Sequence, residues 1–331
     1  STPIKSSAAS DVYKRQICVY AICKNEEQFV ERWMKSMSEA DLVVVMDTGS
    51  TDGTVEKLRG LGARVEQTIV NPWRFDTARN LSLELVPEEA DICVCTDLDE
   101  FFEEGWRKKL ELCWTANATQ GSYRYTWNFL PDGSEGHVFW IEKIHTRKNY
   151  RWIHPVHEIL QYTGSGSPII VPLEGIQLNH RADDSKSRAQ YLPLLELSVK
   201  EAPNDDRNMH YLGREYYYRG MWEKAIATLM HHLEMPSATW KDERCASMRY
   251  IAKCWNNLKS ERDARCWMLR AVAEAPYLRE PYLDLAENCY QREDWIGALY
   301  WIDLALQIEN QTKTYILSLI HILRAHETEL H

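Results

Sequence analysis

The chain has 331 residues, of which 44% are hydrophobic and 27% are charged, and its formal net charge is −10. This length leaves room for two globular domains. The acidic balance argues against nucleic acid as a partner, because binding to phosphates relies on clustered Lys and Arg. No apolar run approaches the ~20 residues needed to span a bilayer.

The nine cysteines form no CxxC pair, and Cys93 and Cys95 sit inside an apolar run. We therefore expect a reduced, cytoplasmic protein whose cysteines act as small hydrophobic residues. The spacing typical of zinc ligands is absent.

The two ends share a coding peculiarity. Residues 11–16 read DVYKRQ and residues 317–322 read LSLIHI. One short DNA sequence encodes DVYKRQ on one strand and LSLIHI on the complementary strand. Two such matches at opposite ends of the chain are not expected by chance. We expect residues 1–16 and 317–331 to be foreign tails and exclude them from functional reasoning.

Strand-like and helical patterns alternate through the first hundred residues. Apolar runs at 17–22, 41–46, 65–69 and 91–96 predict strands, and the segments around 29–33, 55–61 and 77–85 predict helices. Such alternation predicts a parallel sheet covered on both faces, with ligands bound at the carboxyl ends of the strands. Residues 123–128, 138–144 and 169–171 predict further strands, in a part of the sheet that we expect to be more antiparallel.

An internal repeat replaces the strand pattern after Ser187. Small residues recur at Gly213, Ala252 and Ala286, and the last two are 34 residues apart. A period of 34 residues is typical of tetratricopeptide helix pairs. We predict three repeats within residues 188–316, preceded by a helix at 191–202 that belongs to a partial repeat, with Pro203, Pro236 and Pro276 following helix ends.

Two polar strings follow predicted strands. Residues 47–54 read DTGSTDGT and residues 95–100 read CTDLDE. Because residues two apart in an extended chain point the same way, Asp97 and Asp99 are expected to share one small site. Their carboxylates favour Mg²⁺ or Mn²⁺, which also binds the phosphates of a substrate. We expect this positive charge to arrive with the substrate, and Glu100 receives no chemical role.

Four strings in order carry a resemblance: VYAICKNEE, VVVMDTGSTDGT, NPWRFDTARN and VCTDLDEFF. Together they resemble a family 2 glycosyltransferase of the GT-A fold, over residues 17–187. A GT-A domain followed by tetratricopeptide repeats is also similar to bacterial peptide S-glycosyltransferases of the sublancin-synthesis type. The resemblance implies a nucleoside-diphosphate sugar as donor, a divalent metal, and a glycan, peptide or protein as acceptor, with the repeats available for a homodimer or a protein partner.

The resemblance also implies roles for individual residues in the donor site. Asp47 reads the base or ribose, Glu26 lines the nucleoside pocket, and Asp76 or Arg79 holds the nucleotide or pyrophosphate. Asp97 faces the ribose or a metal-bound water, and Asp99 is the metal ligand.

Two later segments complete the predicted site. An inverting transferase needs a general base, for which Glu158 is preferred and His157 is the alternative, both within the string RWIHPVHEIL. His180 is assigned as a further metal ligand, and Arg181 is an alternative contact for the diphosphate.

Two other functions remain open at this point. A nucleotidyltransferase also uses an α/β sheet with paired carboxylates, but it predicts a Gly-rich basic loop after the first strand, where this chain has AICKNEE. A non-catalytic repeat scaffold with a decayed transferase domain predicts loss of an Asp at 97 or 99, and both are present.

Overall fold

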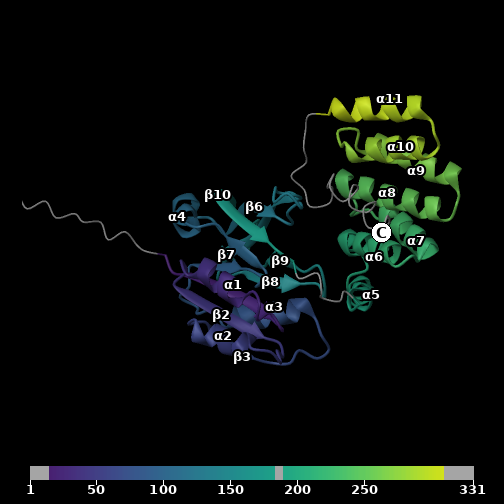
Figure 1. Cartoon of the computed structure of the whole chain (residues 1–331). Coiled ribbons are helices and arrows are strands. Elements are labelled where there is room, and N and C mark those ends of the chain that lie inside the picture. The colour runs from purple at the N-terminus through teal and green to yellow at the C-terminus, as the bar shows by residue number, and fades with distance from the viewer. Residues whose placement is uncertain (1–14, 183–188, 309–331) are drawn as a thin grey trace, which may run out of the picture.

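The computed structural model describes residues 15–182 and 189–308, which form an N-terminal α/β region and a C-terminal helical region (Figure 1). The predicted ends of the domains and repeats, at 187 and 316, and nearly all of the two predicted foreign tails lie outside the described residues. Within the described ranges, no helix is both long and apolar enough to cross a bilayer.

The α/β region is built on one large mixed sheet with the strand order β3-β2-β1-β4-β7-β6-β10-β5. Its strands are β1 (Ile17–Cys23), β2 (Leu42–Asp47), β3 (Arg64–Gln67), β4 (Ile92–Cys95), β5 (Glu100–Phe102), β6 (Gln120–Thr126), β7 (Val138–Thr146) and β10 (Ile170–His180). Strand β1 pairs in parallel with β2 and β4, and β2 pairs in parallel with β3. The polar loops after these strands therefore meet at one edge, as the sequence predicts.

The second half of the sheet is only partly antiparallel. Strand β7 is antiparallel to both β4 and β6, but β10 runs parallel to β6. Strand β10 is also far longer than the predicted 169–171, and β5 was not predicted at all. A separate hairpin joins β8 (Tyr150–Ile153) to β9 (Ile159–Tyr162), and sequence patterning missed it because both strands are short.

Alternating side chains of β1 explain how the sheet is covered. Ile17, Val19 and Ala21 pack with helices α1 (Val30–Met37), α2 (Thr54–Gly60) and α4 (Trp106–Cys113). Cys18 and Tyr20 point to the other face, which holds α3 (Phe75–Glu84) and the β8–β9 hairpin. Because both faces are buried, the strand reads as a continuous apolar run rather than as an alternation.

The helical region consists of α5 (Tyr191–Glu201) followed by three pairs. The pairs are α6 (Asp206–Tyr218) with α7 (Trp222–Glu234), α8 (Lys241–Asn257) with α9 (Glu261–Glu274), and α10 (Glu280–Gln291) with α11 (Trp295–Leu306). The small residues of the predicted repeat are buried where paired helices meet, and a Cβ at Gly213 would lie 2.5 Å from the Leu229 side chain. Helix pairing is thus confirmed, whereas the tetratricopeptide identity stays a prediction.

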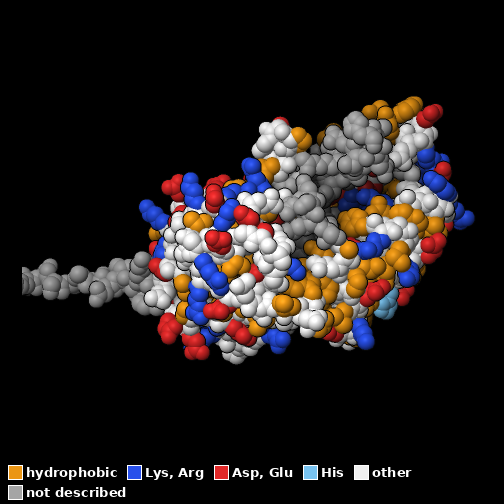
Figure 2. Space-filling view, turned by 60° about the horizontal axis from the view of Figure 1, so that its bottom comes forward, with side chains coloured by type: hydrophobic (Ala, Val, Ile, Leu, Met, Phe, Trp, Pro, Cys, Tyr) orange, Lys and Arg blue, Asp and Glu red, His pale blue; other side chains and the backbone are white. Residues whose placement is uncertain are grey.

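The outer face of α11, the last helix among the described residues, is apolar. Ile296 and Leu299 of α11 are 85% and 62% exposed. Figure 2 shows hydrophobic side chains gathered on the helical region, whereas charged side chains of both signs are interspersed over the α/β region.

Direct contacts join the two regions through α5 and α6. Arg74 forms an ion pair with Glu201 at 2.6 Å, and the Phe75 ring meets the edge of Tyr191. The ring of Tyr211 stacks on His157 with centroids 4.0 Å apart. The helical region is therefore packed against the segment that carries the predicted base.

Candidate active site

The loops after β1 and β2 hold each other. Both oxygens of the fully buried Asp47 carboxylate accept hydrogen bonds from the Ser50 N–H, and one also accepts from the Gly49 N–H at 3.1 Å. The Thr54 hydroxyl accepts a bond from the Glu26 N–H at 2.8 Å. The loop that carries Glu26 is thus bonded to the loop that follows Asp47. The Asp47 carboxylate itself stabilises the turn that follows β2.

Gly49 makes this turn possible. Its φ of +108° lies in the left-handed region that L side chains rarely adopt. The turn brings the Gly49 and Ser50 N–H groups to the Asp47 carboxylate, which accepts hydrogen bonds from both.

Arg79, on α3, lies at the centre of a group of charged side chains, here called the charged cluster, that also includes Asp97 and Glu158. Its guanidinium donates to Glu158, and it also donates to Asp97, whose carboxylate oxygen lies 2.9 Å away. The group also lies 5.1 Å from the ring centre of Trp152 and contacts the Cys95 sulfur. Arg79 is 5% exposed and cannot deprotonate, so it supplies a fixed positive charge beneath two carboxylates.

A second cation lies on the neighbouring strand. The Lys143 ammonium of β7 lies 3.5 Å from Asp97 and 3.2 Å from Glu100. Burial by itself raises the pKa of Asp97, but the charges of Arg79 and Lys143 outweigh it and hold that pKa well below its usual range. The expectation that the compensating charge must come with the substrate is therefore wrong for Asp97 and Glu100.

Glu100 has a structural role that the sequence did not indicate. Its side chain is 1% exposed and accepts hydrogen bonds from the Tyr125 hydroxyl at 2.8 Å and from the Asp97 N–H at 2.9 Å. It fixes the backbone of the turn and anchors Lys143. A lysine within the mostly apolar predicted strand 138–144, next to Glu142, is the sequence signal that could have revealed this pairing.

Asp97 and Asp99 do not lie side by side on an extended chain. The backbone turns at Leu98 and Asp99, and the Glu100 N–H donates to the Asp97 carbonyl at 3.0 Å. The predicted shared site is wrong in this respect, because a turn rather than a strand follows Cys95. The two carboxylates have different partners, and only Asp99 contacts His180.

Asp99 and His180 form the pair best suited to a metal ion. Nε2 of His180 lies 3.2 Å from the Asp99 carboxylate, and Nδ1 lies 2.8 Å from the Trp127 carbonyl. A carbonyl at Nδ1 fixes the tautomer in which Nε2 is a ligand, as is typical of metal-bound histidines. Burial alone lowers the pKa of His180, but the hydrogen bond and negative charge of Asp99 reverse this and raise it. The donor set fits Mn²⁺ or Mg²⁺ with water and phosphate as further ligands.

The segment between β8 and β9 presents Glu158 and turns both histidines toward the helices. His154 and His157 have φ of 77° and 51°, which is uncommon for residues other than glycine. His154 lies 3.3 Å from Asp205, and His157 stacks on Tyr211, while the Glu158 side chain is 11% exposed and bonds to Arg79. Of His154, His157 and Glu158, only Glu158 therefore bonds to Arg79.

Asp76 lies at the joint between the regions. Both of its oxygens accept hydrogen bonds from Arg74, at 3.0 and 2.8 Å, and Arg74 also reaches Glu201 on α5. Of the two alternatives for a nucleotide contact, the structure brings Arg79 and not Asp76 to Asp97.

Three further groups near Asp99 and Asp97 bear on the chemistry. The Arg181 N–H donates to the Asp99 carbonyl at 3.0 Å, and an Arg32 guanidinium N–H donates to the same carbonyl at 3.2 Å. Burial raises the pKa of the Cys95 thiol to about 11, so this cysteine stays neutral and is not a nucleophile. Arg32 gave no sequence signal, because it is one more charged residue on an amphipathic helix.

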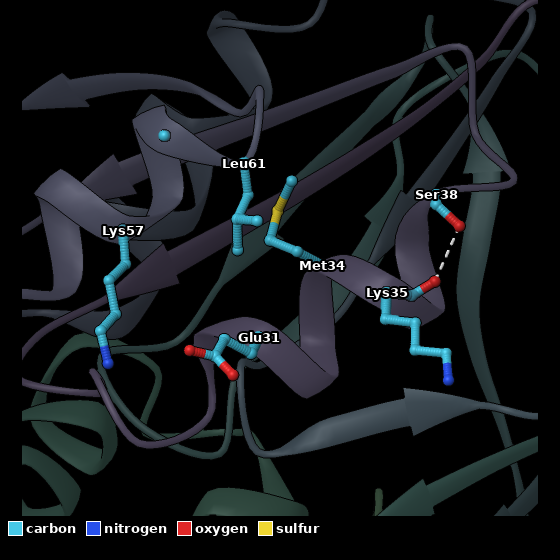
Figure 3. Close-up of a pocket in the computed structure, with 7 residues that line it drawn as sticks. Glu31, Met34, Lys35, Ser38, Lys57 and Leu61 are labelled. Atoms are coloured by element: carbon cyan, nitrogen blue, oxygen red, sulfur yellow. Dashed lines mark hydrogen bonds between the residues drawn. The ribbon is translucent and has the colours of Figure 1, made fainter.

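A separate hollow of about 650 Å³ lies between α1 and α2 (Figure 3). Its labelled lining residues are Glu31, Met34, Lys35, Ser38, Lys57 and Leu61. None of the predicted donor-site residues lines it, so the charged cluster at the strand ends remains the candidate active site.

Comparison with known proteins gives matches to parts of the chain. Residues 18–161 match the family model described as Glycosyl transferase family 2. An uncharacterized glycosyltransferase of Rickettsia bellii is 31% identical over 117 residues, which are 35% of this chain and 37% of that protein. This chain therefore spans little more than a third of that relative.

Two solved structures are similar over part of the chain. Glucosyl-3-phosphoglycerate synthase from Mycobacterium tuberculosis, in complex with Mn²⁺, uridine diphosphate and glucosyl-3-phosphoglycerate, is 27% identical, with 34% of this chain and 44% of that chain covered and a TM-score of 0.29. PilF of Pseudomonas aeruginosa is 15% identical, with 36% and 53% covered and a TM-score of 0.31. The α/β region at residues 18–161, with its polar loops gathered at the carboxyl ends of β1, β2 and β4, is thus similar to the glycosyl transferase family 2 model.

Proposed function

We propose that this chain is a metal-dependent, inverting glycosyltransferase that moves a sugar from a nucleoside-diphosphate sugar to a glycan, peptide or protein acceptor. The observation that carries the proposal is the cluster at the edge of the family 2 domain, where Arg79 joins Asp97 to Glu158 and Asp99 pairs with His180. The cluster combines the buried guanidinium of Arg79, a candidate pair of metal ligands in Asp99 and His180, and the Glu158 carboxylate for proton transfer, all at one edge of the sheet.

Asp99 and His180 would hold the divalent ion, and the ion would neutralise the charge of the departing diphosphate. The residues of the chain do the rest. Arg79 keeps Asp97 ionised and oriented toward the donor, and the β1 and β2 loops with Glu26 and Asp47 enclose the nucleoside. The Arg32 side chain and the Arg181 backbone N–H both donate to the Asp99 carbonyl. The two guanidinium groups would add positive charge beside the diphosphate.

Glu158 is proposed as the general base. It would take the proton of the acceptor hydroxyl or thiol as that oxygen or sulfur bonds to the anomeric carbon. The bond from that carbon to the diphosphate oxygen breaks on the opposite face, and its electron pair leaves with the diphosphate. His157 is the weaker alternative, because its ring is occupied by the stack on Tyr211.

The helical region is proposed to present the acceptor or a protein partner. Tyr191 of α5 and Tyr211 of α6 contact His157, beside Glu158, and the pairs of helices that follow extend away from this segment (Figure 1). Stacked helix pairs of the tetratricopeptide type offer extended surfaces that suit a peptide or a protein. A second copy of the chain is one such partner.

A donor screen tests the proposal. UDP-, GDP-, dTDP- and CMP-sugars are added to the full chain with Mn²⁺ or with a chelator, and nucleotide release and melting temperature are measured. We expect one nucleotide class to raise the melting temperature only when metal is present, since a ligand of the native state stabilises it by mass action.

Variants give the test its control. Asp99→Asn should abolish metal-dependent nucleotide release, whereas Glu56→Gln, an exposed carboxylate change in the same domain, should leave it intact. If Asp99→Asn releases nucleotide as fast as the unmodified chain, the metal assignment is wrong. If no donor class binds or turns over, the transferase proposal itself fails.

A further inference from the structure

A second group of metal-ligating side chains lies in the helical region, far in sequence from the candidate active site. Asp206 is the first residue of α6, His232 lies in the last turn of α7, and Glu243 lies in the first turn of α8. Because successive helices run in opposite directions, the start of α6, the end of α7 and the start of α8 come to the same end of the stack (Figure 1). The topology therefore gathers residues that are separated by up to 37 positions, which is why spacing in the sequence gave no signal.

The three ligand atoms are close enough to be drawn to one ion. One ligand atom of each residue lies within 4.8 Å of the other two, and Nε2 of His232 lies 3.2 Å from Oε1 of Glu243. A tetrahedral ion with bonds of about 2.0–2.2 Å needs ligand atoms roughly 3.5 Å apart. His232 and Glu243 already meet this spacing, and the half-buried Asp206 has the freedom to close the remainder.

A second layer of polar groups orients the histidine. Ser247 Oγ lies 3.0 Å from Nδ1 of His232 and 2.8 Å from Nδ1 of His210. Ser247 and His232 are both fully buried, so the imidazole is held in one orientation with Nε2 directed at the carboxylates. A hydrogen bond to the second ring nitrogen is the usual support for a metal-bound histidine.

The charges at this end of the stack are unbalanced. Glu243 is 3% exposed, and across the described part of the chain its one ion pair is with His232. Among residues 15–182 and 189–308, the Asp206 carboxylate has no hydrogen-bond or ion-pair partner. Two carboxylates thus face a single imidazole, and buried carboxylates without matching cations are costly unless a cation joins them.

We propose that Asp206, His232 and Glu243 bind one divalent transition metal, with Zn²⁺ as the ion that suits a ligand set of one imidazole and two carboxylates. Water reaches the fourth position through the half-exposed side of Asp206. The ion joins the ends of three helices next to Asp205, which lies 3.3 Å from His154 at the joint with the α/β region. Its role is to fix the helical region, independently of the donor-site metal.

The test uses the full chain after treatment with a chelator. Co²⁺ is titrated in the absence of nucleotide, and visible absorption reports a four-coordinate site; Zn²⁺ is then added to displace it. We expect one equivalent of Co²⁺ to give the absorption, and Zn²⁺ to raise the melting temperature by several degrees through preferential binding to the native state.

Four variants decide the outcome. Asp206→Asn changes a side chain without partners and should fold normally, yet lose the Co²⁺ absorption and most of the Zn²⁺ stabilisation. Glu243→Gln should do the same, whereas Glu234→Gln, an exposed change on α7, should retain both. Asp99→Asn should also retain both, since it alters only the donor site.

Two results would overturn the proposal. If Asp206→Asn and Glu243→Gln bind Co²⁺ as the unmodified chain does, the three residues are not ligands and His232 and Glu243 form an ion pair only. If the absorption instead disappears in Asp99→Asn, the ion belongs to the donor site. Neither result depends on whether the chain transfers sugar.

Discussion

The buried arginine of the α/β domain, Arg79, and that of the helical region, Arg249, neutralise carboxylates in different ways. In the α/β domain, Arg79 and Lys143 are shared among three carboxylates, and the Asp97 side chain is still 32% exposed at the loop edge. In the helical region, Arg249 of α8 pairs with Asp284 of α10 one to one, and these side chains are 10% and 4% exposed. Three carboxylates with two cations at a partly exposed edge of the sheet can still bind a positively charged ligand. A buried pair of one arginine and one aspartate between helices leaves no charge for a ligand to neutralise.

The largest effect that we expect tests the shared cluster. Arg79→Met would leave Glu158 without its cationic partner and Asp97 with the more distant Lys143, which should lower the free energy of unfolding by about 3–5 kcal/mol, as is typical when one partner of a buried ion pair is removed. Urea denaturation measures this loss. Arg79→Lys keeps the charge but not the fork of donors, so it should recover only part of the stability. Equal stability of Arg79→Met and the unmodified chain would show that the cluster is not buried as described.

The matched pair in the helices should behave differently when both partners are replaced. Asp284→Asn strands the Arg249 charge and should cost about 3 kcal/mol, whereas Arg249→Met with Asp284→Leu should cost much less, because well-packed apolar residues often substitute for a buried pair without loss. Denaturation of the two variants measures the difference. In neither of them should donor binding change, and a change would mean that the two regions are coupled through this pair.

The choice of base gives a smaller but sharper comparison across the joint. Glu158→Gln can still accept from Arg79, so donor binding should persist while kcat falls by about 100-fold, as is typical for loss of a general base. His157→Asn tolerates the left-handed backbone and should lose about 1 kcal/mol of stability from the ring stack, with kcat little changed.

Kinetics and melting of both variants, with Glu142→Gln as an exposed control, check this assignment. A 100-fold loss of kcat in His157→Asn, with Glu158→Gln active, would reverse the roles of the two residues.

The last expected effect concerns pH and is spread over both regions. His145 of β7 is fully buried, and Nε2 lies 2.7 Å from the Tyr20 hydroxyl while Nδ1 lies 2.8 Å from the Thr146 carbonyl. Burial lowers the pKa of His145 from 6.5 to about 4. The unfolded chain therefore binds the proton first as the pH falls, and stability is lost between pH 6.5 and 4, by about 2 kcal/mol at pH 5.

Burial also holds the pKa of His210, on α6, well below its usual value. The helical region should therefore also lose stability as the pH falls. Urea denaturation at pH 7 and pH 5 measures the sum, and His145→Asn isolates the part from the sheet. If the slope with pH is unchanged in His145→Asn, the α/β domain is not the source of the acid sensitivity.

Sequence patterning predicted the elements whose burial follows a simple period. The strands at 17–22 and 41–46 and the helix pairs are confirmed within a few residues, since each buries a continuous run or one stripe. The β8–β9 hairpin and the length of β10 were missed, because four-residue strands and a bulged strand leave little periodic signal.

The candidate site was predictable where motifs supplied it and not where tertiary packing did. The sequence indicated Arg79, Asp97 and Glu158 as separate site residues. It did not reveal that the Arg79 guanidinium pairs with both carboxylates. Lys143 lies 43 residues from Glu100, and only the pairing of β7 with β4 brings it to the edge of the sheet. Contacts between distant strands are set by the whole sheet, so no local pattern contains them.

The joint at α5 and α6 also constrains how the molecule can be recombined. Glu201, Asn208 and Tyr211 contact Arg74, His154 and His157, and the last three all lie within residues 18–161, which match the family 2 model. A chimera that exchanged the whole helical region would remove the surface that supports the turn before Glu158. A graft point after α7, with α5 to α7 kept beside the native sheet, would instead allow new helix pairs to be attached while that turn stays supported.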